Sequence, residues 1–379
     1  MPHIEKHWDI FCAAVDNYGD VGVAWRLARQ LAAEHGIGVR LFVDDRDRLQ
    51  RIAPTPAPGV EVRHWNGPAG DFSRADGGFS DVVIEAFGCG LPAAYLDAMC
   101  ARPAQPVWIN LEYLSAEPWI EDSHGLASRQ PRRPLTRHFY FPGFTPRSGG
   151  LLRERGLLAR RDAFVGDATA RAMLWRTLRC AAPAPDALLV SLFCYPNAAL
   201  SPLLDAWSGG ATPVFAIAPE GVAAAELDAW TGIAPRRPGQ SMRRGRLTLA
   251  CVPFVAQDDY DRVLWSCDLN FVRGEDSFVR AQWAAKPLVW HCYPQAGNAQ
   301  LAKLDAFLAR YGAGLAPDVA AAQSALAQAW NHGDPPGPAW TAFAAALPAL
   351  TAHAQGWARA LGALPDLAAG LVAFSQKLV

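Results

Sequence analysis

Two short segments of the sequence combine carboxylates, glycines and a hydroxyl at spacings that suit ligand chemistry. One runs Asp16-Asn17-Tyr18-Gly19-Asp20-Val21-Gly22, and the other runs Arg273-Gly274-Glu275-Asp276-Ser277. In the first segment, Asp16 and Asp20 flank a glycine turn that backbone and ligand can approach closely. Two carboxylates there would repel a pyrophosphate, so the segment predicts a catalytic or hydroxyl-binding role. A simple helix cap is the alternative for each aspartate.

The second segment joins an apolar run to a helical pattern. Residues 269–272 are short and apolar enough for a buried strand, and residues 278–285 carry apolar side chains at the spacing of one helix face. If the strand belongs to an open parallel sheet, the turn between them lies where such sheets bind ligands. Ser277 and the free amides of the first helical turn can hold a phosphate there, while Glu275 or Asp276 suits a sugar hydroxyl. The alternative is a capped helix without a ligand.

The elements that must position these segments alternate between strand and helix in two halves of the chain. Strands are predicted at residues 9–15, 39–43, 60–65, 81–87, 107–111 and 138–141, and, beyond two prolines near residue 184, at 187–194, 213–218, 247–253, 269–272 and 288–291. Helical patterns separate several of them, which indicates α/β organisation with parallel sheets. Residues 116–137 lose periodicity and gather Arg129, Arg132, Arg133 and Arg137, which predicts a long surface loop.

Aromatic and amide side chains follow several strands of the second half. They are Phe193, Tyr195, Phe254, Gln257 and Tyr293. If the strands are parallel, these side chains gather at one edge of the sheet, where flat rings can stack on a base and an amide can contact its edge. The alternative is that the rings are ordinary core residues.

Length and composition limit the class of protein. A chain of 379 residues, 51% hydrophobic and 19% charged, is too long for one ordinary core and predicts two globular domains. A formal net charge of -1 argues against a general nucleic-acid binder. We find no signal-peptide pattern and no uninterrupted apolar run that would span a bilayer, so we expect a cytoplasmic protein without a membrane partner. The eight cysteines show no zinc-like spacing and are most simply free thiols.

The first segment also leaves a nicotinamide-dependent oxidoreductase open. Gly19 and Gly22 match the last two glycines of the dinucleotide fingerprint, but Asn17 stands where the first should be. Asp44 and Asp45 follow the strand at 39–43, where such a fold places an acid against a ribose.

The two segments, together with the pair Phe193 and Tyr195, resemble the bacterial protein-arginine rhamnosyltransferases that modify elongation factor P. The resemblance covers essentially the whole chain. It implies an α/β fold of the GT-B type, with two Rossmann-like domains facing a central cleft. It places an acceptor domain at residues 1–183, with a C-terminal helix of about 360–379 packing back on it, and a nucleotide-sugar donor domain at 184–359.

The resemblance also assigns roles to residues. Asp20 would be the general base, supported by Asp16, in an inverting transfer of L-rhamnose from dTDP-β-L-rhamnose to an arginine of elongation factor P. The expected substrate-binding residues are Asn17, Tyr18, Gly19, Phe193, Tyr195, Phe254, Gln257, Arg273, Glu275, Asp276, Ser277 and Tyr293. Neither a metal nor a cofactor is expected. The alternatives are the oxidoreductase and a non-catalytic protein that binds a nucleotide sugar.

Overall fold

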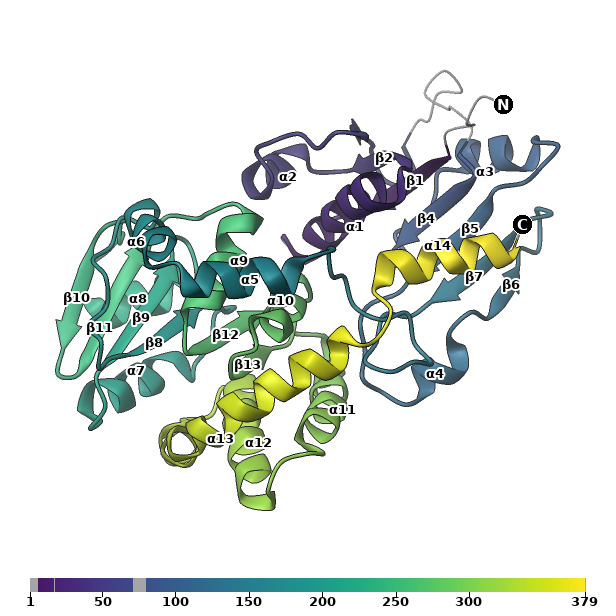
Figure 1. The fold of residues 1–379 in the computed structure, drawn as a ribbon. Helices are drawn as coiled ribbons and strands as arrows, with labels where there is room; N and C mark the ends of the chain where they lie inside the picture. Colours follow the sequence, from purple (N-terminus) through teal and green to yellow (C-terminus); the bar gives the residue numbers. More distant parts are fainter. Residues whose placement is uncertain (1–5, 17, 71–79, 379) are drawn as a thin grey trace. The chain divides into compact units, whose positions relative to one another are not determined.

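The computed structural model describes residues 6–16, 18–70 and 80–378, and they form two compact α/β units (Figure 1). Unit 1 comprises residues 1–155 and 362–379, and unit 2 comprises residues 156–361. The predicted α/β class, with two Rossmann-like sheets, is confirmed. The boundary lies at residue 155 rather than at 183, because helices α5 and α6 pack against α9 of unit 2. The C-terminal helix belongs to unit 1 and contacts α1.

Unit 1 is built on a seven-stranded sheet with the order β3-β2-β1-β4-β5-β7-β6. All neighbouring strands are parallel except β6 and β7. The strands are β1 (His7–Cys12), β2 (Gly38–Val43), β3 (Val60–His64), β4 (Val82–Ala86), β5 (Val107–Leu111), β6 (Ala127–Arg129) and β7 (Thr136–Tyr140). The helices are α1 (Gly19–His35), α2 (Arg46–Ile52), α3 (Ala93–Cys100), α4 (Trp119–Ser123) and α14 (Leu367–Leu378).

Unit 2 is built on a six-stranded sheet with the order β10-β11-β9-β8-β12-β13. Only the edge strand β10 runs antiparallel to its neighbour. The strands are β8 (Leu188–Leu192), β9 (Val214–Pro219), β10 (Ser241–Arg244), β11 (Leu247–Val252), β12 (Leu269–Arg273) and β13 (Leu288–His291). The helices are α5 (Leu157–Gly166), α6 (Ala168–Thr177), α7 (Leu200–Gly209), α8 (Ala224–Thr231), α9 (Gln257–Ser266), α10 (Asp276–Ala284), the 3₁₀ turn η2 (Ala296–Asn298), α11 (Gln300–Gly312), α12 (Pro317–His332) and α13 (Gly337–Gly362).

Central strands of both sheets are buried on both faces, which is why they read as apolar runs rather than as alternating patterns. The polar exception in β1 is Asp9, which is fully buried. Its carboxylate accepts hydrogen bonds from Arg40 on β2 and from Tyr95 on α3. A buried charge is tolerated because these partners satisfy it.

The stretch at residues 116–137 is not the long surface loop that the sequence predicts. It forms α4, β6 and the start of β7. Arg137 lies partly buried on β7, where its guanidinium contacts the buried Glu85 carboxylate at 3.4 Å and lies over the ring of Phe139. A buried carboxylate needs a positively charged partner, and Arg137 is that partner for Glu85 on β4. This structural role accounts for one arginine of the group at residues 129–137.

Helices α13 and α14 together form an apolar stretch that, by length and hydropathy alone, could cross a membrane. The sequence interpretation found no such stretch, because the chain is interrupted near Pro365. In the structure, the helix breaks between Gly362 and Leu367, and its two halves belong to different units. Phe343 and Leu350 of α13 are fully buried in the hydrophobic core of unit 2, as in the core helix of a globular protein.

Candidate active site

Each sheet has a point at which the strand order changes direction. In unit 1, the chain builds β2 and β3 on one side of β1 and then β4 and β5 on the other, and in unit 2 the change lies between β8 and β12. Open parallel sheets bind ligands beyond the carboxyl ends of the strands at this point. Both segments selected from the sequence lie there, the first after β1 and the second after β12.

Asp20 lies in the first turn of α1 and is buried, with a relative exposure of 1%. Its Oδ2 atom accepts hydrogen bonds from the amides of Val15 and Asp16, each at 2.8 Å. The hydroxyl of Tyr113, which follows β5, also hydrogen-bonds the carboxyl. The two loop amides and the Tyr113 hydroxyl therefore fix the position of the Asp20 carboxyl, and this carboxyl in turn holds the loop after β1.

In the described part of the loop after β1, carboxylates of the protein already occupy backbone amides that a pyrophosphate would need. The amide of Ala14 donates to both oxygens of Asp44, at 3.0 and 3.2 Å, so the amides of residues 14, 15 and 16 are all bound by carboxylates of the protein. In a dinucleotide-binding fold, this turn and the start of α1 face the cofactor. Asp45 instead caps α2 by accepting from the Arg48 amide at 2.9 Å. These contacts disfavour the nicotinamide alternative.

The surroundings of Asp20 change its acidity. Burial raises the pKa of the Asp20 carboxyl above its ordinary value, and the hydrogen bonds from the amides of Asp16 and Val15 and from Tyr113 oppose the rise only in part. Proximity to the Asp44 carboxylate adds to the rise. A raised pKa makes a carboxylate a stronger base near neutral pH, as general-base catalysis requires.

The structure brings the other described residues of the first segment around this aspartate. Asp16 is half-buried, and a Cβ atom at Gly19 would lie only 2.7 Å from its Oδ2, so a larger residue there would displace the Asp16 carboxylate. Tyr18 is the N-cap residue of α1, and its hydroxyl accepts from Arg51 on α2 at 3.2 Å. Asn17 lies outside the described residues.

In unit 2, Arg273 at the end of β12 organises the aromatic residues that follow β8. Its guanidinium carbon lies 4.4 Å from the ring centre of Phe193 and 4.9 Å from that of Tyr195. Its Nη1 donates to the Cys194 carbonyl at 3.0 Å. Tyr195 also contacts the ring of Tyr293 edge-on, at 5.6 Å between centres. Three of the predicted aromatic residues, two after β8 and one after β13, thus form one cluster, with Arg273 of the intervening strand β12 at its centre.

His291 belongs to the same cluster and is missing from the sequence-based set. It ends β13, pairs in register with Arg273, and meets the edge of the Tyr195 ring at 5.3 Å. Burial, and then the nearby charge of Arg273, lower the pKa of His291 to about 4. The imidazole is therefore neutral at physiological pH, and its buried Nδ1 has no hydrogen-bond partner among the described residues. In the sequence, His291 could have been identified by its position two residues before Tyr293, because alternate residues of a strand point to the same side.

The acidic turn after β12 is tied to its own backbone and to α9. The Ser277 hydroxyl donates to the Arg273 carbonyl and accepts from the Arg273 amide at 3.1 Å. Gln257, at the start of α9, donates to Asp276 Oδ2 at 2.8 Å, and Glu275 is the N-cap residue of α10. Ser277 therefore bonds the backbone of Arg273 rather than capping α10, whose N-cap residue makes no side-chain cap hydrogen bond, and its phosphate-binding role stays a prediction.

Phe254 follows a strand that lies on the other side of β8 from Arg273. It follows β11, is half-buried, and donates its backbone amide to Glu220 at 3.3 Å. The sheet order places β9 and β8 between β11 and β12, and Phe254 lies three residues before Gln257, which begins α9.

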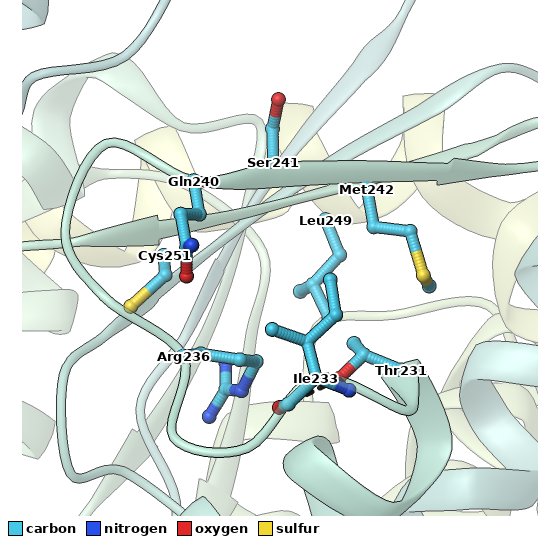
Figure 2. Close-up of a pocket in the computed structure, with 8 residues that line it drawn as sticks. All are labelled: Thr231, Ile233, Arg236, Gln240, Ser241, Met242, Leu249 and Cys251. Carbon is cyan, nitrogen blue, oxygen red and sulfur yellow. Dashed lines mark hydrogen bonds between the residues drawn. The ribbon is translucent and has the colours of Figure 1, made fainter.

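Two surface hollows of unit 2 lie away from these residues. One, beside the edge strands β10 and β11, is lined by Arg236, Cys251 and their neighbours and has a volume of about 10 Å³, enough for one water molecule (Figure 2). The other is a shallow groove of about 480 Å³ on α11 and α12, lined mainly by small side chains such as Ala309 and Ala320. Neither contains a predicted site residue, and the first is far too small for a nucleotide sugar.

Comparison with known proteins points to one family. Residues 8–376 match the family described as elongation-factor P (EF-P) rhamnosyltransferase EarP. Protein-arginine rhamnosyltransferases from Pseudomonas putida and Neisseria meningitidis are 52% and 35% identical to the chain, and the alignments cover 98% of both chains for the first and 97% and 95% for the second.

Solved structures show the same likeness. One, described as the structural basis for EarP-mediated arginine glycosylation of translation elongation factor EF-P, is 40% identical, with a TM-score of 0.73 over 99% of this chain and 100% of that chain. The spinosyn rhamnosyltransferase SpnG is only 15% identical and has a TM-score of 0.53, with 97% and 99% of the two chains covered. This second likeness shows the fold alone, which is the predicted GT-B type.

Proposed function

Because the chain belongs to the EF-P rhamnosyltransferase family, we propose that it transfers L-rhamnose from dTDP-β-L-rhamnose to an arginine side chain of EF-P. The observation that carries the chemistry is the buried Asp20 carboxylate at the switch point of unit 1, held by two amides and a tyrosine hydroxyl. The family match over residues 8–376 supports the choice of substrates.

Asp20 is the general base of this proposal. An arginine guanidinium is protonated at neutral pH and is a poor nucleophile. A carboxylate can orient it and accept a proton as the bond from nitrogen to the anomeric carbon forms. The raised pKa of Asp20 suits this step, and Asp16, on the same turn, adds negative charge that attracts the guanidinium.

The Arg273 cluster of unit 2 binds the donor. Rings such as Phe193 and Tyr195 offer flat surfaces for the thymine base or the sugar, and Arg273 supplies positive charge for the diphosphate. The N-terminus of α10, with the positive end of its helix dipole, adds to this charge stabilisation. Gln257 and Asp276 already form a hydrogen-bonded pair, which presents oxygen atoms to a ribose hydroxyl.

The reaction proceeds as a single displacement with inversion. Departure of the sugar builds positive charge on the ring and negative charge on the leaving diphosphate. Arg273 and the helix-start amides meet that negative charge, so we expect no requirement for a metal ion or a cofactor. A covalent rhamnosyl-enzyme, or a retained anomeric configuration in the product, would contradict the single displacement.

The proposed acceptor indicates where in the cell the enzyme acts. EF-P is a translation factor, so we place the enzyme in the cytoplasm, with EF-P and dTDP-rhamnose as its partners. A formal net charge of -1 gives no general affinity for nucleic acid.

One experiment tests the proposal against its alternatives. The protein is incubated with dTDP-rhamnose and EF-P, with and without EDTA, and EF-P is then weighed by mass spectrometry. A gain of one rhamnose on an arginine, unchanged by EDTA, is expected. Stabilisation of the protein by dTDP-rhamnose without any mass gain would instead indicate a binding protein, and stabilisation by NAD alone would indicate an oxidoreductase.

A further inference from the structure

Phe87 adopts a backbone conformation that bulky residues rarely adopt. It follows β4 directly and has a φ angle of +58°, in the left-handed region. Its amide donates to the Leu111 carbonyl at 2.7 Å, and the next amide, that of Gly88, donates to Asn110 Oδ1 at 3.1 Å. Strained residues of this kind persist only where their surroundings hold them, and they gather at functional sites.

The ring of Phe87 has one clear partner at this edge of the sheet. It stacks on the ring of Tyr113, with 4.4 Å between the centres and 17° between the planes. Tyr113 follows the end of β5, and the residue before it, Glu112, donates its amide to the Tyr140 carbonyl at 2.9 Å. The strands on both sides of β5 thus fix the position of the Tyr113 ring.

The hydroxyl of this fixed ring reaches the candidate base. It hydrogen-bonds the Asp20 carboxyl, whose Oδ2 is already held by two amides of the loop after β1. A chain of contacts therefore runs from the strained Phe87 through Tyr113 to Asp20, and it joins the ends of β4 and β5 to the start of α1.

We propose that Tyr113 is a positioning residue, whose hydroxyl sets the orientation of the Asp20 carboxylate for proton acceptance and whose ring is held in place by Phe87. The inference deepens the proposed function and rests on it. A general base works only when the accepting oxygen points at the proton. Two amides on one oxygen leave the carboxylate a pivot about that atom, and the hydrogen bond from the Tyr113 hydroxyl adds a further restraint.

Tyr113→Phe tests this role, because it removes the hydroxyl and keeps the ring that stacks on Phe87. We expect kcat for rhamnosyl transfer to fall roughly 10- to 100-fold, the range for a lost hydrogen bond to a charged group. The acid limb of the kcat/KM profile should move to higher pH, because a bond that favours the charged carboxylate is gone. The dissociation constant for dTDP-rhamnose, measured by calorimetry, should not change.

Two further variants separate positioning from packing. Phe87→Gly keeps the left-handed backbone, removes the ring, and should reduce kcat in the same direction but less than Tyr113→Phe. Tyr311→Phe removes another tyrosine hydroxyl, on α11 of unit 2, which is buried and has no hydrogen-bond partner among the described residues. Its activity should equal that of the unaltered protein.

The outcomes are distinguishable. An unaltered kcat and acid limb in Tyr113→Phe, beside a normally active parent protein, would overturn the role of Tyr113 alone. A parallel loss of donor affinity would also overturn it, since Tyr113 would then belong to the donor site. A parent protein that transfers no rhamnose to EF-P would overturn the proposed function and this inference with it.

Discussion

Arg273 and His291 occupy paired positions on the neighbouring parallel strands β12 and β13, so their side chains leave the sheet on the same face. Both meet the ring of Tyr195, Arg273 over its face and His291 at its edge. Burial and, after it, the charge of Arg273 lower the pKa of His291 and keep its imidazole neutral. The proposed donor site thus combines one permanent cation with one neutral imidazole, which can donate to a diphosphate oxygen or accept from a hydroxyl.

Asp20→Asn should separate catalysis from donor binding. Asparagine keeps the size and can still accept from the amides of Val15 and Asp16, but it cannot take a proton. Turnover should fall by roughly 10²–10⁴-fold, while calorimetry shows dTDP-rhamnose binding as before. Asp45→Asn is the matched control, because Asp45 follows β2 at the same sheet edge but caps α2. Donor affinity that falls together with turnover would place Asp20 in the nucleotide site.

The raised pKa of Asp20 predicts how activity and stability depend on pH. Activity should decline on the acid side at a higher pH than an ordinary aspartate would give, because the base must be deprotonated. Stability has the opposite trend. The folded state holds this proton more tightly than the unfolded state, so the contribution of Asp20 to the free energy of unfolding falls as pH rises from the unfolded to the folded pKa. At neutral pH, Asp20→Asn should therefore unfold at the same or a higher temperature, and a clearly lower melting temperature would refute this account.

Arg273→Lys should weaken donor binding even though the charge is kept. A lysine cannot lie flat over both Phe193 and Tyr195 while donating to the Cys194 carbonyl. We expect the dissociation constant for dTDP-rhamnose to rise about tenfold or more, consistent with the loss of a charge-assisted bond. Arg262→Lys on α9, in an exposed pair with Asp259, is the control and should bind the donor normally. Equal affinities for the two variants would count against the cluster as the diphosphate site.

His291 predicts a loss of stability in acid. Its folded pKa of about 4 lies below the unfolded value of about 6.5, so the unfolded state takes up the proton first as pH falls. The free energy of unfolding should therefore decrease between these two values, by on the order of 3 kcal/mol from this residue. Urea denaturation of the parent protein and of His291→Gln at several pH values measures the difference. Curves with the same pH dependence would show that His291 does not carry this effect.

Gly370→Ala should destabilise unit 1 through one contact. A Cβ atom at this position of α14 would overlap the Tyr140 hydroxyl. The expected loss is roughly 1–3 kcal/mol, as for overpacking elsewhere. Gly356→Ala in α13, where a Cβ atom meets nothing within 4 Å, is the control and should be neutral or stabilising. Adding Tyr140→Phe to Gly370→Ala should restore much of the lost melting temperature, and no recovery would mean that the overlap is not the cause.

The alternation of strands and helices was predictable because buried parallel strands are apolar runs separated by helical patterns. The unit boundary was not, since the amphipathic pattern of α5 and α6 does not say which unit they cover. Asp20 and Arg273 could be identified from the sequence because each lies next to a glycine turn and near acidic residues. His291 and Tyr113 did not, because their roles depend on contacts across the sheet, between β12 and β13 and between the end of β5 and α1.

The return of α14 to unit 1 has a consequence for how the protein is made. Gln30 on α1 donates to Asp366, and Arg153 donates to the Leu364 carbonyl, so residues that are synthesised after unit 2 complete the unit that was begun before it. Asp20 lies in the first turn of α1, and α1 packs against α14. A nascent chain therefore cannot complete unit 1 until unit 2 and α14 have been synthesised, so the two units cannot fold strictly one after the other.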